Sequence, residues 1–106
     1  MAKFLLEVNY TLDGARGLKS EGGSARVAAA TALIEGLGGT VDCFYFAFGE
    51  TDVYLIVDLP DATSVAAAAL AVNAGGGATT KTVVLMTAAE ADVAASMTTS
   101  YRPPGS

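Results

Sequence analysis

Four polar side chains that could orient a small ligand fall in segments with strand-like sequence. Glu7 and Asn9 lie where apolar and polar residues alternate, and Tyr45 and Tyr54 lie in two later segments rich in aromatic and β-branched residues. Because every second side chain of a strand shares a face, all four are expected on one face of a sheet. There they could bind a small polar molecule, and a shielded Glu7 could act as a general base. Alternatively, they hydrogen-bond across a subunit interface and bind nothing.

A second candidate site is the turn Gly49-Glu50-Thr51-Asp52, which separates the two aromatic segments. The acids Glu50 and Asp52 could bind a cation or an amine. In an enzyme that needs no cofactor, Asp52, Glu7 or Tyr45 would move the proton. The same turn residues suit a tight hairpin, because Gly49 can supply a special backbone conformation and Asp52 can form local hydrogen bonds. A structural turn is therefore the preferred interpretation.

The third candidate is a group of three basic residues, Arg16, Lys19 and Arg26, around Gly22-Gly23-Ser24. A helix that begins at these glycines has free N–H groups, which attract anions. No Gly-Lys-Ser or Gly-Lys-Thr follows the glycines, so the segment is not a phosphate-binding P-loop. The basic residues give a weak anion-site signal, and the alternative is a solvated helix face.

Composition excludes several kinds of chemistry. The 106 residues include no histidine and one cysteine, Cys43, so the usual zinc and haem ligand sets are missing and no internal disulfide can form. An oxygen-only magnesium or calcium site is the remaining alternative, but the acids are scattered rather than arranged as a ligand loop, and no metal or organic cofactor is expected. Cys43 is interpreted as a small strand residue rather than a reactive thiol, because no histidine accompanies it as a base.

Charge and hydropathy limit the partners and the location. The net charge is −5 and no dense basic cluster is present, which argues against nucleic acid as a partner. No apolar run reaches the roughly 18 residues that a membrane span needs. The first residues lead directly into a strand-like segment without an export signal, so a cytoplasmic location is expected.

The elements that must position these residues follow the order strand, helix, strand, strand, helix, strand, with a short helix at the end. This order predicts an α+β fold, a ferredoxin-like βαββαβ sandwich with helices on one face of the sheet. Thr11, Ser24 and Asp61 are expected to cap helices, and Thr87 with Glu90 forms a capping box. The predicted strands cover 3–11, 40–48, 53–59 and 79–86, the second long helix covers 62–74, the single domain covers 1–97, and a C-terminal tail covers 98–106.

The uncovered face of the predicted sheet indicates self-association. Its two central strands place Leu5 and Ile56 beside the four polar candidates, and such an apolar face is not expected to stay in contact with water. Hydrophobic residues make up 52% of the chain and charged residues only 16%, which points in the same direction. Pairing of two sheets would cover the face and enclose a small cavity, so a homodimer or higher homo-oligomer is expected.

Several short motifs along the chain carry a resemblance to a known family. They are Thr11-x-x-Gly14, Leu37-Gly38-Gly39, Phe44-Tyr45, Gly49-Glu50-Thr51-Asp52, Asp58-Leu59-Pro60-Asp61 and the strand-like segment 80–86.

With these motifs the chain resembles the GYD-domain family over roughly residues 3–97, although Thr51 stands where the family's name-giving tyrosine usually lies. The resemblance implies a fold similar to dimeric α+β barrels and no particular reaction. We therefore expect a homo-oligomer that binds a small organic ligand at the open sheet face. A structural or regulatory self-assembly module without catalytic activity is the alternative.

Overall fold

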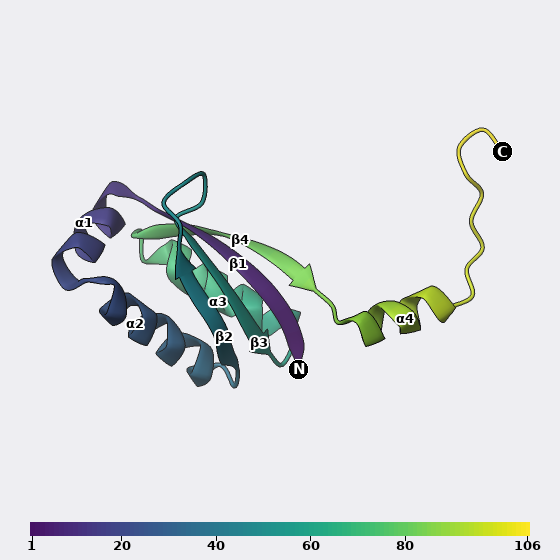
Figure 1. Ribbon diagram of the computed structural model, residues 1–106, viewed down its shortest axis with the longest axis horizontal. Coiled ribbons are helices and arrows are strands. Elements are labelled where there is room, and N and C mark those ends of the chain that lie inside the picture. The colour runs from purple at the N-terminus through teal and green to yellow at the C-terminus, as the bar shows by residue number, and fades with distance from the viewer.

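The four strands form in the predicted order, and the helical segment between the first two strands is divided into two helices, so the chain has four helices. The computed structural model describes residues 1–106 (Figure 1). The strand segments combine alternating burial with β-branched and aromatic residues, whereas the alanine-rich segments become helices. The elements are β1 (Ala2–Tyr10), α1 (Leu12–Glu21), α2 (Gly23–Gly36), β2 (Thr40–Phe46), β3 (Val53–Leu59), α3 (Ala62–Ala74), β4 (Ala78–Leu85) and α4 (Ala88–Ser96).

The sheet has the strand order β2-β3-β1-β4, and every neighbouring pair is antiparallel. This arrangement confirms the predicted α+β, ferredoxin-like architecture. The helix-facing side chains of the central strands β1 and β3 form the core together with residues of α2 and α3. The opposite face of the sheet has no helix over it, and it is called the open face below. The core residues are Phe4, Leu6, Ile34, Val53, Leu55, Val57, Leu59, Val65 and Ala68.

Three helix starts follow their predicted caps. The side chains of Thr11 and Asp61 accept hydrogen bonds from the backbone N–H groups of Gly14 and Ser64, and the capping box of Thr87 is present. The predicted cap at Ser24 is wrong. Gly22, with φ 88°, both ends α1 and precedes α2, so Ser24 already lies in the first turn of α2.

The β2–β3 connection differs from the expected turn. β2 ends at Phe46, two residues earlier than predicted, and Phe48 rather than Gly49 has the positive φ, at 54°. The ring of Phe48 stacks on that of Phe46, with centroids 5.7 Å apart. The backbone oxygen of Asp52 accepts from the N–H of Ala47 at 2.8 Å. The stacking and this hydrogen bond accompany the unusual backbone conformation of Phe48. The expectation that Gly49 would supply the special backbone conformation of the turn was therefore wrong.

A β-bulge in the edge strand β2 changes which side chains reach the open face. Val41 pairs with Val57, and the next pairing is Cys43 with Ile56, so Asp42 is the extra residue. The bulge keeps Val41 on the helix side and brings Cys43 to the open face. It also places Asp42 at the edge of that face.

The C-terminal helix α4 stands apart from the rest of the chain (Figure 1). All of its residues are exposed, and it has only marginal contact with other elements. Val93 and Met97 are among the large apolar side chains that this segment leaves exposed. None of the four helices has the length and the hydropathy that crossing a bilayer requires.

Candidate functional site

One row of side chains crosses the open face through all four strands. The register pairs Tyr45 with Tyr54, Tyr54 with Glu7, and Glu7 with Lys81. Paired residues of neighbouring strands present their side chains on the same face. The structure therefore brings together three of the four predicted polar residues and adds Lys81, which the sequence analysis did not include. We call Tyr45, Tyr54, Glu7 and Lys81 the polar row.

A second, apolar row lies directly beside the polar row. Its members are Cys43, Ile56, Leu5 and Val83, again one from each strand. In the single chain Tyr45 is 68% exposed, Tyr54 38% and Val83 39%. The centre of the open face is therefore apolar and aromatic, and it remains in contact with water.

Glu7 is a half-buried residue at the centre of the polar row. None of the three salt bridges of the chain includes Glu7, although Lys81 is its partner in the strand register. A half-buried carboxylate without an ion pair is free to meet a group outside the chain.

The fourth predicted residue of this face, Asn9, holds the β2–β3 connection instead. Its side-chain oxygen accepts from the N–H of Asp52 at 3.0 Å, and an Asp52 carboxylate oxygen accepts from the N–H of Tyr10 at 2.8 Å. Asn9 and Asp52 thus join the end of β1 to the turn. Glu50 is exposed, whereas Thr51 is only 8% exposed.

An ion cluster at the other end of the open face was missed by the sequence analysis. The Nζ of Lys3 donates to Asp58 at 3.0 Å and also to Asp42. Both hydrogen bonds raise the pKa of Lys3, and the one with Asp42 has the larger effect. The hydrogen bond from Lys3 also lowers the pKa of the Asp42 carboxyl. The cluster depends on the bulge at Asp42, which strict strand alternation does not predict.

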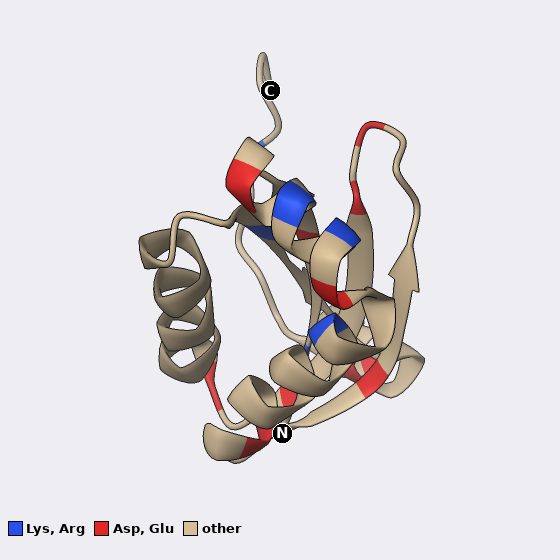
Figure 2. Cartoon of the chain, turned by 90° about the vertical axis from the view of Figure 1, so that its left-hand side faces the viewer, with Lys and Arg blue, Asp and Glu red and all other residues tan.

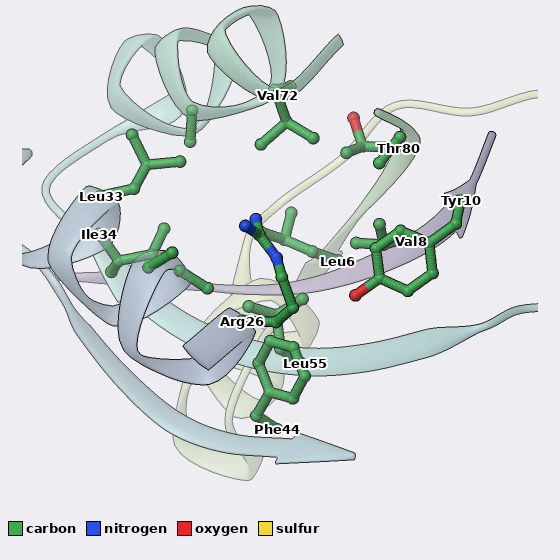
Figure 3. A pocket seen from close by; sticks show the side chains of 15 residues that line it. Leu6, Val8, Tyr10, Arg26, Leu33, Ile34, Phe44, Leu55, Val72 and Thr80 are labelled. Carbon is green, nitrogen blue, oxygen red and sulfur yellow. The ribbon is translucent and has the colours of Figure 1, made fainter. Parts of the chain in front are cut away.

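The two main hollows of the molecule lie on the helix side of the sheet. The narrower one, of about 110 Å³, lies between α2, α3 and the sheet, and thirteen of its fifteen lining residues are hydrophobic. Arg26 of α2 reaches into this space, and the hydroxyl of Tyr10 points towards it (Figure 3). A wider hollow of about 380 Å³ shares Tyr10, Arg26, Leu33, Val72 and Ala78 with it. The two therefore adjoin at Arg26 and Tyr10.

The three basic residues of the predicted anion site have different surroundings. Arg16 and Lys19 are exposed on α1 and line neither hollow, whereas Arg26 lines both. An Nη1–H of Arg26 donates to Glu21 at 3.0 Å across the break at Gly22. Burial raises the pKa of the Tyr10 hydroxyl, and the nearby charge of Arg26 opposes part of that rise.

The acids do not converge as a metal site would require, since no three Asp, Glu or Cys side chains gather in the chain. The helix-side hollow has only an indirect signal in the sequence. α3 contains no charged residue (Figure 2), and its alanines leave space that larger side chains would fill. The distance between α2 and α3 depends on tertiary packing, which the hydrophobic periodicity of the sequence does not predict.

Comparison with known proteins gives one match. The family model described as GYD domain matches residues 4–95, which covers most of the chain. No curated protein and no solved structure matches the chain significantly.

Proposed function

The chain belongs to the GYD domain family, and we propose that it works as a homo-oligomer in which the open faces of two sheets pair. The observation that supports this proposal is the arrangement of the open face. Its centre holds the apolar row and the two tyrosines with one opposite-charge pair, Glu7 and Lys81, in the polar row, whereas its ends hold charged or hydrogen-bonded side chains at Lys3 and at Asn9. An apolar, aromatic centre with a polar rim is the usual anatomy of a subunit interface.

The charges of the open face also suit a second copy of the same chain. Glu7 and Lys81 occupy the same row on neighbouring strands, with opposite charges. In a two-fold interface each residue of one subunit meets a residue of the other reciprocally. Glu7 could then pair with Lys81 of the partner subunit, which would satisfy the carboxylate that has no ion pair within its own chain.

The exposed C-terminal helix supports the same proposal. α4 leaves the edge strand β4 and projects beyond the sheet (Figure 1). Val93 of α4 is 57% exposed in the single chain, and Met97 directly after the helix is 63% exposed. A helix in this position could pack on a second subunit and enlarge the interface.

A second candidate function is the binding of a small polar ligand at the open face, between the paired sheets. It is favoured by the half-buried Glu7, which has no ion pair, beside the phenols of Tyr45 and Tyr54. In a single chain this face is not hollowed into either of the two main pockets, so the second sheet would have to supply the other wall.

Static light scattering with two matched variants tests the assembly. The wild-type chain is expected to have a mass of at least two chains at micromolar concentration. Tyr45→Glu should dissociate it, because an unpaired charge in an interface core is strongly unfavourable. Leu70→Glu is the control, since Leu70 is 69% exposed on α3, on the other side of the sheet. A monomeric wild type, or equal masses for both variants, would contradict the proposal.

A further substitution distinguishes the two candidate functions of the open face. Glu7→Gln keeps the shape of the side chain and removes its charge. If Glu7 binds a ligand, this variant should remain an oligomer and lose the small molecule that native mass spectrometry detects in the wild type. If Glu7 pairs with the partner subunit, the variant should dissociate more readily on dilution than the wild type.

A further inference from the structure

We propose that the hollow between α2, α3 and the sheet binds an amphipathic carboxylate, a monocarboxylic acid with an unbranched apolar tail. Arg26 and Tyr10 would hold the acid group, and the tail would occupy the apolar space above β1 and β3. This site lies on the opposite side of the sheet from the proposed subunit interface. It therefore goes beyond the proposed function and does not depend on it.

The way the helices pack explains why the space exists. α2 packs mainly on the edge strand β2 and α3 mainly on the edge strand β4, and the two helices have little direct contact. Between them the facing residues are small, including Ala30 and Ala69. The side chains that could close the gap over the centre of the sheet are missing, so an apolar hollow remains. Apolar hollows of this kind accept apolar ligands.

The lining of the hollow has an apolar inner part and a small polar part, and this division determines the class of ligand. Leu6, Leu55 and Ala68 line the inner part, where a polar group would lose its hydrogen bonds to water. Arg26 and Thr80 are the two lining residues that are not hydrophobic. A ligand that fits this surface has one anionic group and an otherwise apolar body.

Arg26 has donors left for such a ligand. A guanidinium carries five N–H donors, and Glu21 accepts from one of its nitrogens, Nη1. The planar fork of an arginine matches the two oxygens of a carboxylate. Figure 3 shows the guanidinium among Leu6, Leu33 and Val72 of the lining, and the Arg26 side chain keeps 41% of its surface exposed, so a ligand can reach it from solvent.

Tyr10 can add a hydrogen bond to the same acid group. Its hydroxyl points towards the hollow from the end of β1 (Figure 3). A tyrosine hydroxyl has an ordinary pKa of about 10 and is therefore a protonated donor at neutral pH, and burial raises the pKa of Tyr10 further. The wider hollow, bordered by Gly14, Gly75 and Gly77, adjoins the site at this point and offers a path for entry.

Isothermal titration calorimetry of the full chain with octanoate tests the proposal. Octanoate is expected to bind, acetate to bind far more weakly because it lacks the tail, and 1-octanol to bind far more weakly because it lacks the charge. Arg26→Gln should weaken octanoate binding by about tenfold to a hundredfold, the loss of a hydrogen bond to a charged group. Arg16→Gln is the matched control and should bind like the wild type.

A second pair of variants tests the location without changing any charge. Ala30→Leu should fill the hollow, abolish octanoate binding and leave the fold at least as stable as in the wild type, because filling an existing cavity adds buried apolar contacts. Ala28→Leu places the same side chain on the exposed face of α2 and should not affect binding. Tyr45→Glu should also bind octanoate normally, because the site does not need a second subunit.

Three results would overturn the proposal. They are no binding of octanoate to the wild type, equal binding by Arg26→Gln and Arg16→Gln, or unchanged binding by a folded Ala30→Leu. Loss of binding in Glu7→Gln together with normal binding in Arg26→Gln would assign the acid to the open face instead. Normal binding by a monomeric wild type would leave this site intact while contradicting the proposed assembly.

Discussion

Two glycines of α1 should respond in opposite directions to the same substitution. A Cβ on Gly14 would lie 1.7 Å from the carbonyl oxygen of Gly77, so the helix and the loop before β4 would have to separate by more than about 1 Å. A Cβ on Gly17, one turn later, would meet no atom within 4 Å. Gly14 therefore permits a close approach of two backbone segments, whereas Gly17 only lowers helix propensity.

The contacts between α1 and the loop before β4 allow an estimate of how much Gly14→Ala lowers the free energy of unfolding. Separation would break two hydrogen bonds, from the N–H of Thr11 to Gly77 and from its hydroxyl to Gly76, each contributing about 1 kcal/mol. Overpacking adds about 1 to 3 kcal/mol, and the better helix propensity of alanine returns about 1 kcal/mol. The free energy of unfolding should therefore fall by about 2 to 4 kcal/mol.

Urea denaturation followed by circular dichroism, at one fixed protein concentration, measures this difference. Gly17→Ala should raise the free energy of unfolding by about 0.5 to 1 kcal/mol, because alanine loses less conformational entropy in a helix. If Gly14→Ala were as stable as Gly17→Ala, the close packing of α1 on the loop before β4 would be refuted. A glycine at position 14, three residues after Thr11, would then have no packing role.

Three further perturbations have definite expected outcomes. Hydrogen bonds from the backbone N–H and the hydroxyl of Ser64 lower the pKa of Asp61 below the usual value near 3.9, so the charged carboxylate stabilises the fold fully above that pH and loses this effect as the pH falls through the lowered pKa. In urea titrations the wild type should therefore be more stable than Asp61→Asn at pH 6 and lose that advantage between about pH 4 and pH 2. A stability difference that stays constant with pH would contradict this expectation. Removal of residues 87–106 should leave the circular dichroism spectrum of the sheet intact but lower the mass measured by light scattering, and an unchanged mass would exclude α4 from the interface. Gly49→Ala should hardly change the melting temperature, whereas Gly38→Ala should lower it, because Gly38 has a φ of 85° and Gly49 has no positive φ. A larger loss of melting temperature for Gly49→Ala than for Gly38→Ala would contradict these backbone conformations.

Local signals in the sequence predicted most of the fold. β3 at 53–59 and α3 at 62–74 have the predicted bounds, because alternation, the cap at Asp61 and the glycines after Asn73 are all short-range features. The error at Ser24 has a local cause as well. Gly22 can adopt a positive φ, so it ends one helix and allows the next to begin without the predicted side-chain cap.

The features that the sequence did not predict depend on contacts between distant segments. Asp42 reaches Lys3 only because a bulge adds one residue to β2, and strict alternation makes no allowance for a bulge. Arg26 was recognised as basic, but its position in an apolar hollow depends on the angle between α1 and α2 and on the gap to α3. Glu7, Tyr45 and Tyr54 could be assigned to one face because strand parity needs only the order of residues.

The native thiol of Cys43 provides the most direct test that the open face is the subunit interface. Cys43 is the only cysteine of the chain and lies half-buried in the apolar row of that face. Its alkylation by iodoacetamide, followed by mass spectrometry over a dilution series, reports whether that face is covered. We predict slow alkylation at high protein concentration, faster alkylation on dilution, and fast alkylation at every concentration in Tyr45→Glu. A wild-type rate that is equally fast at all concentrations would contradict pairing through the open face.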